Sequence, residues 1–129
     1  MIRLLLIILF FLSSSPVYAE WVKTAESDNA ILYADPDTIR RKGSLVKMWI
    51  LYDFKARQQT IAGKSSWSFK SQAEYDCAEE QARALAVYDY SDPMGDGKIV
   101  YSHTNPDNWV PVIPGSMGDV SLLFACKKK

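Results

Sequence analysis

Residues 45–54, LVKMWILYDF, carry the clearest secondary-structure signal in the chain. Successive side chains of a β-strand point to opposite faces, so period-two patterning predicts a strand here. One face places Leu45, Trp49 and Leu51 beside Lys47, and the other carries Val46, Met48, Ile50 and Tyr52. Because both faces are largely apolar, we predict a central strand that is covered on both sides over part of its length.

Shorter signals precede this strand. Strands are predicted at residues 20–24 and 31–34, with turn-forming residues between them. Proline and aspartate in residues 35–38 interrupt strand pairing, and we expect a tight helical turn there through Ile39. Residues 40–43, Arg-Arg-Lys-Gly, then form a predicted cationic loop at the entrance to the central strand.

Further strands are predicted after the central one. Residues 55–63 are polar and indicate a hairpin loop, whereas residues 64–75 alternate apolar and polar side chains as a half-buried strand does. Residues 77–81 favour a turn or a short helix. Residues 85–90 and 98–103 are the predicted strands of a hairpin, with turn-forming residues between them.

The carboxyl-terminal part has a different pattern. Residues 109–115 contain two prolines, which suits an edge or an extended crossing. Ser116 and Asp119 then resemble a capping box, and Val120, Leu123 and Phe124 fall on one helical face. Lysines at 127–129 suit the carboxyl end of a helix dipole. Strands followed by one helix indicate a single α+β domain.

The first 19 residues have the organisation of a cleavable signal peptide. Arg3 precedes the apolar run 4–12, and Ala19 ends a small-residue cleavage site, so the mature domain is expected to span residues 20–129. A run of nine apolar residues is too short to span a bilayer, and no later segment approaches the required 18. No cysteine lies near the cleavage site, so we expect a product that is not lipid-anchored.

Cys77 and Cys126 are the two cysteines of the sequence. An even cysteine count in an exported protein predicts a disulfide, and two buried thiols are the alternative. This disulfide would join the last turn of the predicted helix to the region before the strand at residues 85–90. The chain-entropy model assigns about 4 kcal/mol to closing a loop of about 50 residues.

Composition argues against most catalytic and nucleic-acid functions. The 129 residues contain 15 basic and 15 acidic side chains, and this balance supplies no field that would attract a nucleic acid. His103 is the single histidine, so neither a metal site nor a cofactor site is expected. The carboxylates Glu74, Asp76, Glu79 and Glu80 are interpreted as a solvated charged turn. The sequence therefore predicts a protein that is not an enzyme.

Large aromatic side chains and one basic run are the candidates for partner contact. The tryptophans are Trp21, Trp49, Trp67 and Trp109, and aromatic residues are enriched in protein interfaces. We interpret Trp49 and Trp109 as core residues and keep Trp67 as a candidate contact residue. Arg40, Arg41 and Lys42 could contact an acidic partner, although a solvated hairpin tip is the commoner meaning of such a run.

The sequence resembles the surface-adhesin protein E family of Gram-negative bacteria in several segments, found in order along almost the whole mature chain. They are residues 33–40 with Lys42-Gly43, 46–53, 74–78, 94–97 and 109–116 before Cys126. The resemblance implies one antiparallel sheet of about six strands, with a carboxyl-terminal α-helix held on its concave face by the Cys77–Cys126 disulfide.

For function, the resemblance implies an exported binding module that recognises a host matrix protein or an envelope component, in the periplasm or outside the cell. A small periplasmic enzyme inhibitor or envelope-stress protein is the alternative, because size, export and one disulfide suit it equally. Exposed strand edges also leave a homodimer open.

Overall fold

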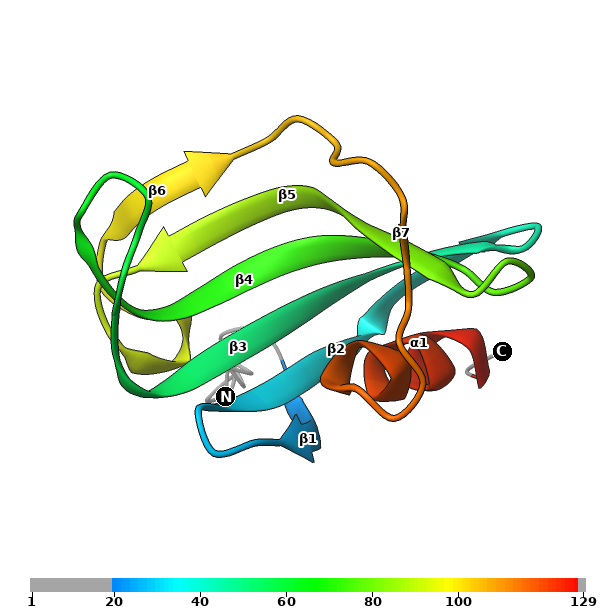
Figure 1. Cartoon of the computed structure of the whole chain (residues 1–129), viewed down its shortest axis with the longest axis horizontal. Coiled ribbons are helices and arrows are strands. Elements are labelled where there is room, and N and C mark those ends of the chain that lie inside the picture. The colour runs from blue at the N-terminus through cyan, green and yellow to red at the C-terminus, as the bar shows by residue number, and fades with distance from the viewer. Residues whose placement is uncertain (1–19, 128–129) are drawn as a thin grey trace, which may run out of the picture.

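The computed structural model describes residues 20–127, so the predicted signal peptide lies outside the described residues. They form one antiparallel sheet of seven strands followed by a helix (Figure 1). The strands are β1 (Val22–Glu26), β2 (Ala30–Lys42), β3 (Leu45–Gln59), β4 (Ser65–Asp76), β5 (Gln81–Tyr90), β6 (Ile99–His103) and β7 (Val110–Pro111). A short 3-10 turn, η1 (Pro93–Gly95), precedes β6, and the helix is α1 (Met117–Lys127).

Sheet order follows chain order from β1 to β6, and β7 pairs with β5. β6 pairs with residues 87–90 of β5, whereas β7 pairs with Gln81 and Ala82 near the start of the same strand. The predicted single antiparallel sheet with a carboxyl-terminal helix is confirmed, and the two prolines of residues 109–115 accompany only a two-residue edge pairing.

The helical turn predicted through Ile39 is wrong, because β2 continues through this segment as a bulge. Thr38 replaces part of the ladder: its Oγ1 accepts the backbone N–H of Trp49 at 2.9 Å and donates to the Asp35 carbonyl at 2.7 Å. The Asp35 carboxylate accepts the N–H of Asp37 at 3.1 Å. Side-chain oxygens therefore satisfy backbone groups that a proline-containing strand would otherwise leave unpaired.

Several predicted boundaries also differ. β3 extends to Gln59, where a loop was expected from residue 55, because its polar end pairs with the start of β4. β5 begins at Gln81 rather than at residue 85, after a turn and not a helix. Arg40, Arg41 and Lys42 belong to the end of β2, and Gly43, with φ of 61°, forms the tight turn that follows.

The amino-terminal cap of α1 has nearly the predicted form. Ser116 Oγ accepts the N–H of Asp119 at 3.2 Å, and the Asp119 carboxylate accepts the N–H of Gly115 at 2.9 Å. Two backbone donors at the helix start are thus satisfied by side chains. This local chemistry explains why the helix starts where the sequence indicated.

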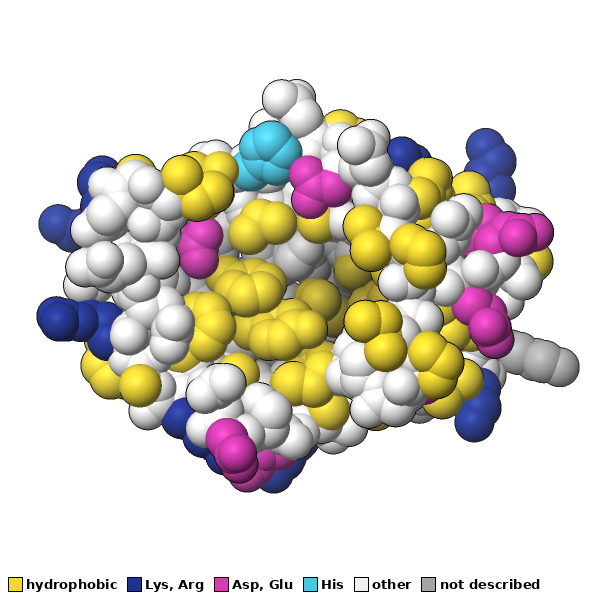
Figure 2. Space-filling model, viewed as in Figure 1, with side chains coloured by type: hydrophobic (Ala, Val, Ile, Leu, Met, Phe, Trp, Pro, Cys, Tyr) yellow, Lys and Arg dark blue, Asp and Glu magenta, His cyan; other side chains and the backbone are white. Residues whose placement is uncertain are grey.

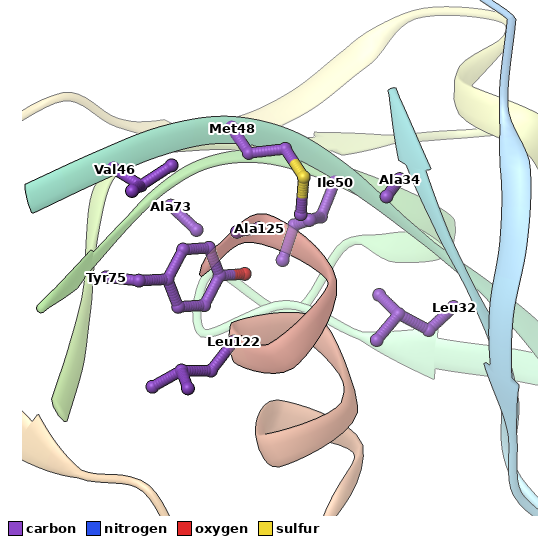
Figure 3. Close-up of a cluster of buried hydrophobic side chains, with 9 residues drawn as sticks. All are labelled: Leu32, Ala34, Val46, Met48, Ile50, Ala73, Tyr75, Leu122 and Ala125. Atoms are coloured by element: carbon purple, nitrogen blue, oxygen red, sulfur yellow. The ribbon is translucent and has the colours of Figure 1, made fainter. Parts of the chain in front are cut away.

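The hydrophobic core lies between the concave face of the sheet and α1 (Figure 3). Its buried members come from β2, β3 and β4 and from the helix: Leu32, Ala34, Val46, Met48, Ile50, Ala73, Tyr75, Leu122 and Ala125. The Tyr75 hydroxyl shares a hydrogen bond with Ser121 of α1, and burial raises the pKa of Tyr75. Beside the helix, Figure 2 shows further hydrophobic side chains lining a hollow in this face.

The disulfide joins Cys77, in the turn after β4, to Cys126 in the last turn of α1. The two Cα atoms lie 5.9 Å apart, which is an ordinary distance for a disulfide. Arg41 reinforces the same attachment, because its guanidinium donates to the Cys126 carbonyl at 2.7 Å. The predicted tether between the helix and the sheet is confirmed.

At the edge of the sheet, Glu26 accepts hydrogen bonds from Lys23 at 2.6 Å and Lys55 at 3.0 Å. These two ammonium groups lower the pKa of Glu26 from 4.5 to about 2. The ion pairs therefore contribute fully above the unfolded pKa, and their contribution is lost as the pH falls towards about 2. Because the pairs are exposed, the contribution is small.

We expect Glu26→Gln to make acid destabilisation shallower between pH 4.5 and about 2 than in the wild type. Urea unfolding at several pH values in low salt measures this difference. High salt should shrink it by screening. Parallel pH curves for the two proteins in low salt would contradict the assignment.

Candidate functional site

The face of the sheet opposite α1, called here the outer face, carries two sites. Alternation along β3 places Lys47, Trp49 and Leu51 on this face, opposite the core residues. Leu51 is fully buried because the η1 turn folds over this part of the face. The predicted two-sided cover of the central strand is therefore present, with α1 on one side and η1 on the other.

Side-chain hydrogen bonds hold η1 in place. The Asp53 carboxylate accepts the N–H of Met94 at 2.8 Å. Ser68 Oγ accepts the N–H of Gly95 at 2.8 Å and donates to the Asp92 carbonyl at 2.7 Å. The turn is thereby anchored to both β3 and β4, and it forms a fixed wall on the outer face.

The first site is a groove of about 300 Å³, called here the cationic groove. Strand pairing forms a row of four residues across β2, β3, β4 and β5. Each residue lies opposite the next, in the order Arg40, Lys47, Glu74 and Arg83. The residues that line the groove are Arg40, Arg41, Lys42, Leu45, Lys47 and Glu74. Pairing between strands thus gathers the basic run and one further lysine around a single carboxylate.

The carboxylate of this groove is already neutralised. Glu74 is only 5% exposed, and Arg83 donates to its Oε1 from Nε at 2.8 Å and from Nη2 at 2.7 Å. Arg83 also lies 4.5 Å from the ring centroid of Trp109. Among the ion pairs within residues 20–127, none involves Arg40, Lys42 or Lys47. The groove therefore presents uncompensated positive charge.

Two interpretations from the sequence are corrected here. Glu74 is not part of a solvated charged turn, although Asp76 does cap such a turn by accepting the N–H groups of Ala78 and Glu79, both at 3.1 Å. Trp109 is half-buried against Arg83 and does not belong to the core cluster. Both errors come from Arg83, the third residue of β5, because its contacts with Glu74 and Trp109 cannot be read from local patterning.

The candidate contact residues separate into two places. Arg40, Arg41 and Lys42 lie together in the cationic groove. Trp67 lies near the start of β4, about 23 Å along the strand from Glu74 at an ordinary strand rise. The tryptophan therefore does not contribute to the cationic groove.

The second site, called here the aromatic pocket, has a volume of about 490 Å³. Its lining residues come from β2 to β6 and from the segment before β1: Trp21, Asp35, Thr38, Trp49, Lys70, Tyr88, Tyr90 and Ile99. The rings of Trp49 and Tyr88 stack with centroids 6.2 Å apart. Trp49, interpreted from sequence as a core residue, is instead a half-buried wall of this pocket.

Lys70 lines the pocket beside two of its aromatic rings. Its ammonium lies 5.0 Å from the Tyr90 ring centroid and 6.0 Å from that of Trp21. The η1 turn packs against the aliphatic part of the Lys70 side chain. The approach is so close that a Cβ added at Gly95 would lie only 2.3 Å from Lys70 Cε. Alternation along β3 correctly predicted that Trp49 shares a face with Lys47, but no sequence signal connects it with Trp21 or Tyr90.

Two further findings concern the described residues only. His103 Nε2 lies 3.4 Å from an Asp107 carboxylate oxygen, and residues 20–127 contain no group of three side chains that could hold a metal ion. In the same part of the chain, no helix has the length and apolar character needed to cross a membrane.

The fold and these two sites define a small binding domain, built on one antiparallel sheet with a disulfide-tethered helix. The chain matches the family model of surface-adhesin protein E over residues 21–127, and it therefore belongs to that family. No curated protein sequence matches it significantly.

Solved structures of Haemophilus influenzae protein E have the same fold. Crystal form II matches with a TM-score of 0.64 at 12% identity, covering 85% of this chain and 89% of that one. The structure of protein E from non-typeable H. influenzae matches with a TM-score of 0.54 at 14% identity, covering 86% and 79% respectively.

Proposed function

We propose that this protein is an exported, non-catalytic binding module that recognises an acidic surface of a protein or envelope component through the cationic groove. One observation carries the proposal: Arg40, Arg41, Lys42 and Lys47 gather in one groove whose carboxylate is already paired. Since the whole chain has a formal net charge of zero, this groove is a local concentration of positive charge. Such patches steer and orient partners of opposite charge.

Export is supported by two independent features. The first 19 residues have the pattern of a cleavable signal, and the Cys77–Cys126 disulfide suits an oxidising compartment. The family description, surface-adhesin protein E, also fits a protein that works outside the cytoplasm. We place the mature chain, residues 20–129, in the periplasm or outside a Gram-negative cell, without a lipid anchor.

The groove is tested by charge reversal. Tagged mature protein should capture its partner from envelope extracts or host matrix, and Arg40→Glu with Lys42→Glu and Lys47→Glu should reduce capture at least about ten-fold. These side chains are exposed, so the variant is expected to fold. The matched control is Arg57→Glu with Lys64→Glu and Lys98→Glu, which reverses three exposed charges outside the groove.

Capture of the same partner should weaken as salt is raised, because exposed charges are screened. Specific capture that is equal in the wild type and the groove variant would contradict the proposal.

Cell fractionation with surface protease shaving tests the location. Mature protein that protease removes from intact cells, or that appears in the medium, indicates a partner outside the cell. Protein wholly protected within the periplasm indicates an envelope partner. Protein found only in the cytoplasm with residues 1–19 retained would overturn the proposed export.

A further inference from the structure

We propose that the aromatic pocket is a saccharide-binding site that takes an uncharged pyranose unit. Its rings would contact the C–H faces of the sugar, and Asp35 and Lys70 would hydrogen-bond its hydroxyl groups. This inference does not depend on the cationic groove, because the two sites share no lining residue.

The size and composition of the pocket suit a small ligand. Its volume of about 490 Å³ lies within the usual range for such sites, which combine apolar walls with a few polar groups. Trp21, Trp49, Tyr88 and Tyr90 supply four ring walls from three separate parts of the chain. Aromatic rings bury a large area at low entropic cost, as contact with a sugar face requires.

The two charged groups of the pocket suit a neutral ligand that carries many hydroxyl groups. Neither Asp35 nor Lys70 takes part in an ion pair within residues 20–127, although both line the same pocket. A carboxylate only accepts hydrogen bonds and an ammonium only donates them, whereas a hydroxyl does both. A polyhydroxylated neutral ligand can therefore satisfy both groups. A cationic ligand would be repelled by Lys70, and an anionic one by Asp35.

Both charged groups are held before any ligand arrives. Asp35 is only 7% exposed, and its carboxylate accepts the N–H of Asp37 at 3.1 Å. The Lys70 ammonium lies over the rings of Trp21 and Tyr90, and the η1 turn restricts the movement of the Lys70 aliphatic chain. A site that is already ordered loses less conformational entropy when it binds.

Further hydrogen-bonding groups of the pocket are available to a sugar. Within residues 20–127, the indole N–H groups of Trp21 and Trp49 take part in none of the internal hydrogen bonds, and the Tyr88 and Tyr90 hydroxyls take part in none either. The Tyr90 hydroxyl is a donor at neutral pH, as an ordinary phenol is, and burial raises its pKa further.

The test uses mature protein and two uncharged oligosaccharides. One is N-acetyllactosamine, found on host glycoproteins, and the other is the β-1,4 trimer of N-acetylglucosamine, a chemistry found in bacterial envelopes. Amide and indole NMR shifts are followed during titration to millimolar sugar. We expect saturable shifts at Trp21, Trp49 and β5 with at least one sugar, and the better ligand identifies the source.

Variants then separate binding from folding. Trp49→Ala and Trp21→Ala should each weaken binding at least about ten-fold, as loss of an aromatic side chain does where bases of a nucleic acid stack on it. Trp21 precedes β1, so Trp21→Ala keeps the test valid if Trp49→Ala does not fold. Trp109→Ala, which removes an indole outside the pocket, should leave sugar affinity unchanged.

Asp35→Asn and Lys70→Met should each weaken binding of the neutral sugar. Absence of saturable shifts with both sugars would overturn the proposal. Tighter binding of sialylated than of unmodified N-acetyllactosamine would overturn the assignment to an uncharged sugar. Neither outcome would affect the cationic groove, whose variant leaves this pocket intact.

Discussion

Replacing both cysteines, Cys77→Ala with Cys126→Ala, is expected to lower the free energy of unfolding by about 4 kcal/mol. The bond closes a loop with a sequence separation of 49 residues, so its loss returns considerable entropy to the unfolded chain. A small domain has only about 5–15 kcal/mol of stability in total, so the effect is large. Urea unfolding followed by tryptophan fluorescence measures it.

Loss of this disulfide should first increase local opening of α1. The helix packs on the sheet through a short set of buried residues, among them Leu122 and Ala125, and the disulfide holds its last turn. We expect limited proteolysis to cut the variant between residues 112 and 127 much faster than the wild type. Local opening of a peripheral element needs less free energy than global unfolding.

Reduced wild-type protein is the control, because it loses the bond but keeps both sulfur atoms that pack against the core. It should be destabilised nearly as much as the variant. Equal stability of the wild type with and without reductant would contradict the predicted role of the disulfide.

Replacing Arg83 by glutamine is expected to cost about 3 kcal/mol of folding stability. Glu74 is only 5% exposed, and Arg83 supplies both short hydrogen bonds to its carboxylate. Removing the guanidinium leaves a buried charge without its partner, and it also removes the contact with the Trp109 ring. The arginine side chain is 28% exposed, so solvent limits the effect to the lower part of the range for buried pairs.

A double variant, Glu74→Gln with Arg83→Gln, tests whether the lost stability comes from leaving the Glu74 carboxylate unpaired. It should regain much of the lost stability, because no uncompensated charge remains in the buried position. Lys47→Gln is the matched control, since Lys47 lies in the same row but is exposed and outside the ion pairs of the described residues. Strictly additive single-variant effects in the double variant would contradict the coupling.

The elements of the fold could be predicted where one local pattern dominates. Alternation identified residues 45–54 as a central strand, and Ser116 with Asp119 located the start of α1. Prediction failed where side chains act on a distant backbone. Thr38 accepts the N–H of Trp49 and turns an expected break into a bulge, a contact that spans 11 residues.

The candidate site was predicted in part for the same reason. The run Arg40, Arg41 and Lys42 is contiguous, so its positive charge is visible without a structure. Glu74 and Lys47 join it only through strand register, and Trp67 is separated from it along β4. The aromatic pocket was missed because its walls belong to segments as distant as Trp21, Trp49 and Tyr90.

The sequence alone determined that the chain is one α+β domain with a carboxyl-terminal helix, a cysteine pair and a basic run, because periodicity, capping and composition act over a few residues. Only the tertiary structure decided that Arg83 neutralises Glu74 and that Trp49 and Lys70 share a pocket with Asp35. Those relations depend on register and on how the η1 turn folds over the sheet, and both are set by contacts between segments far apart in the chain.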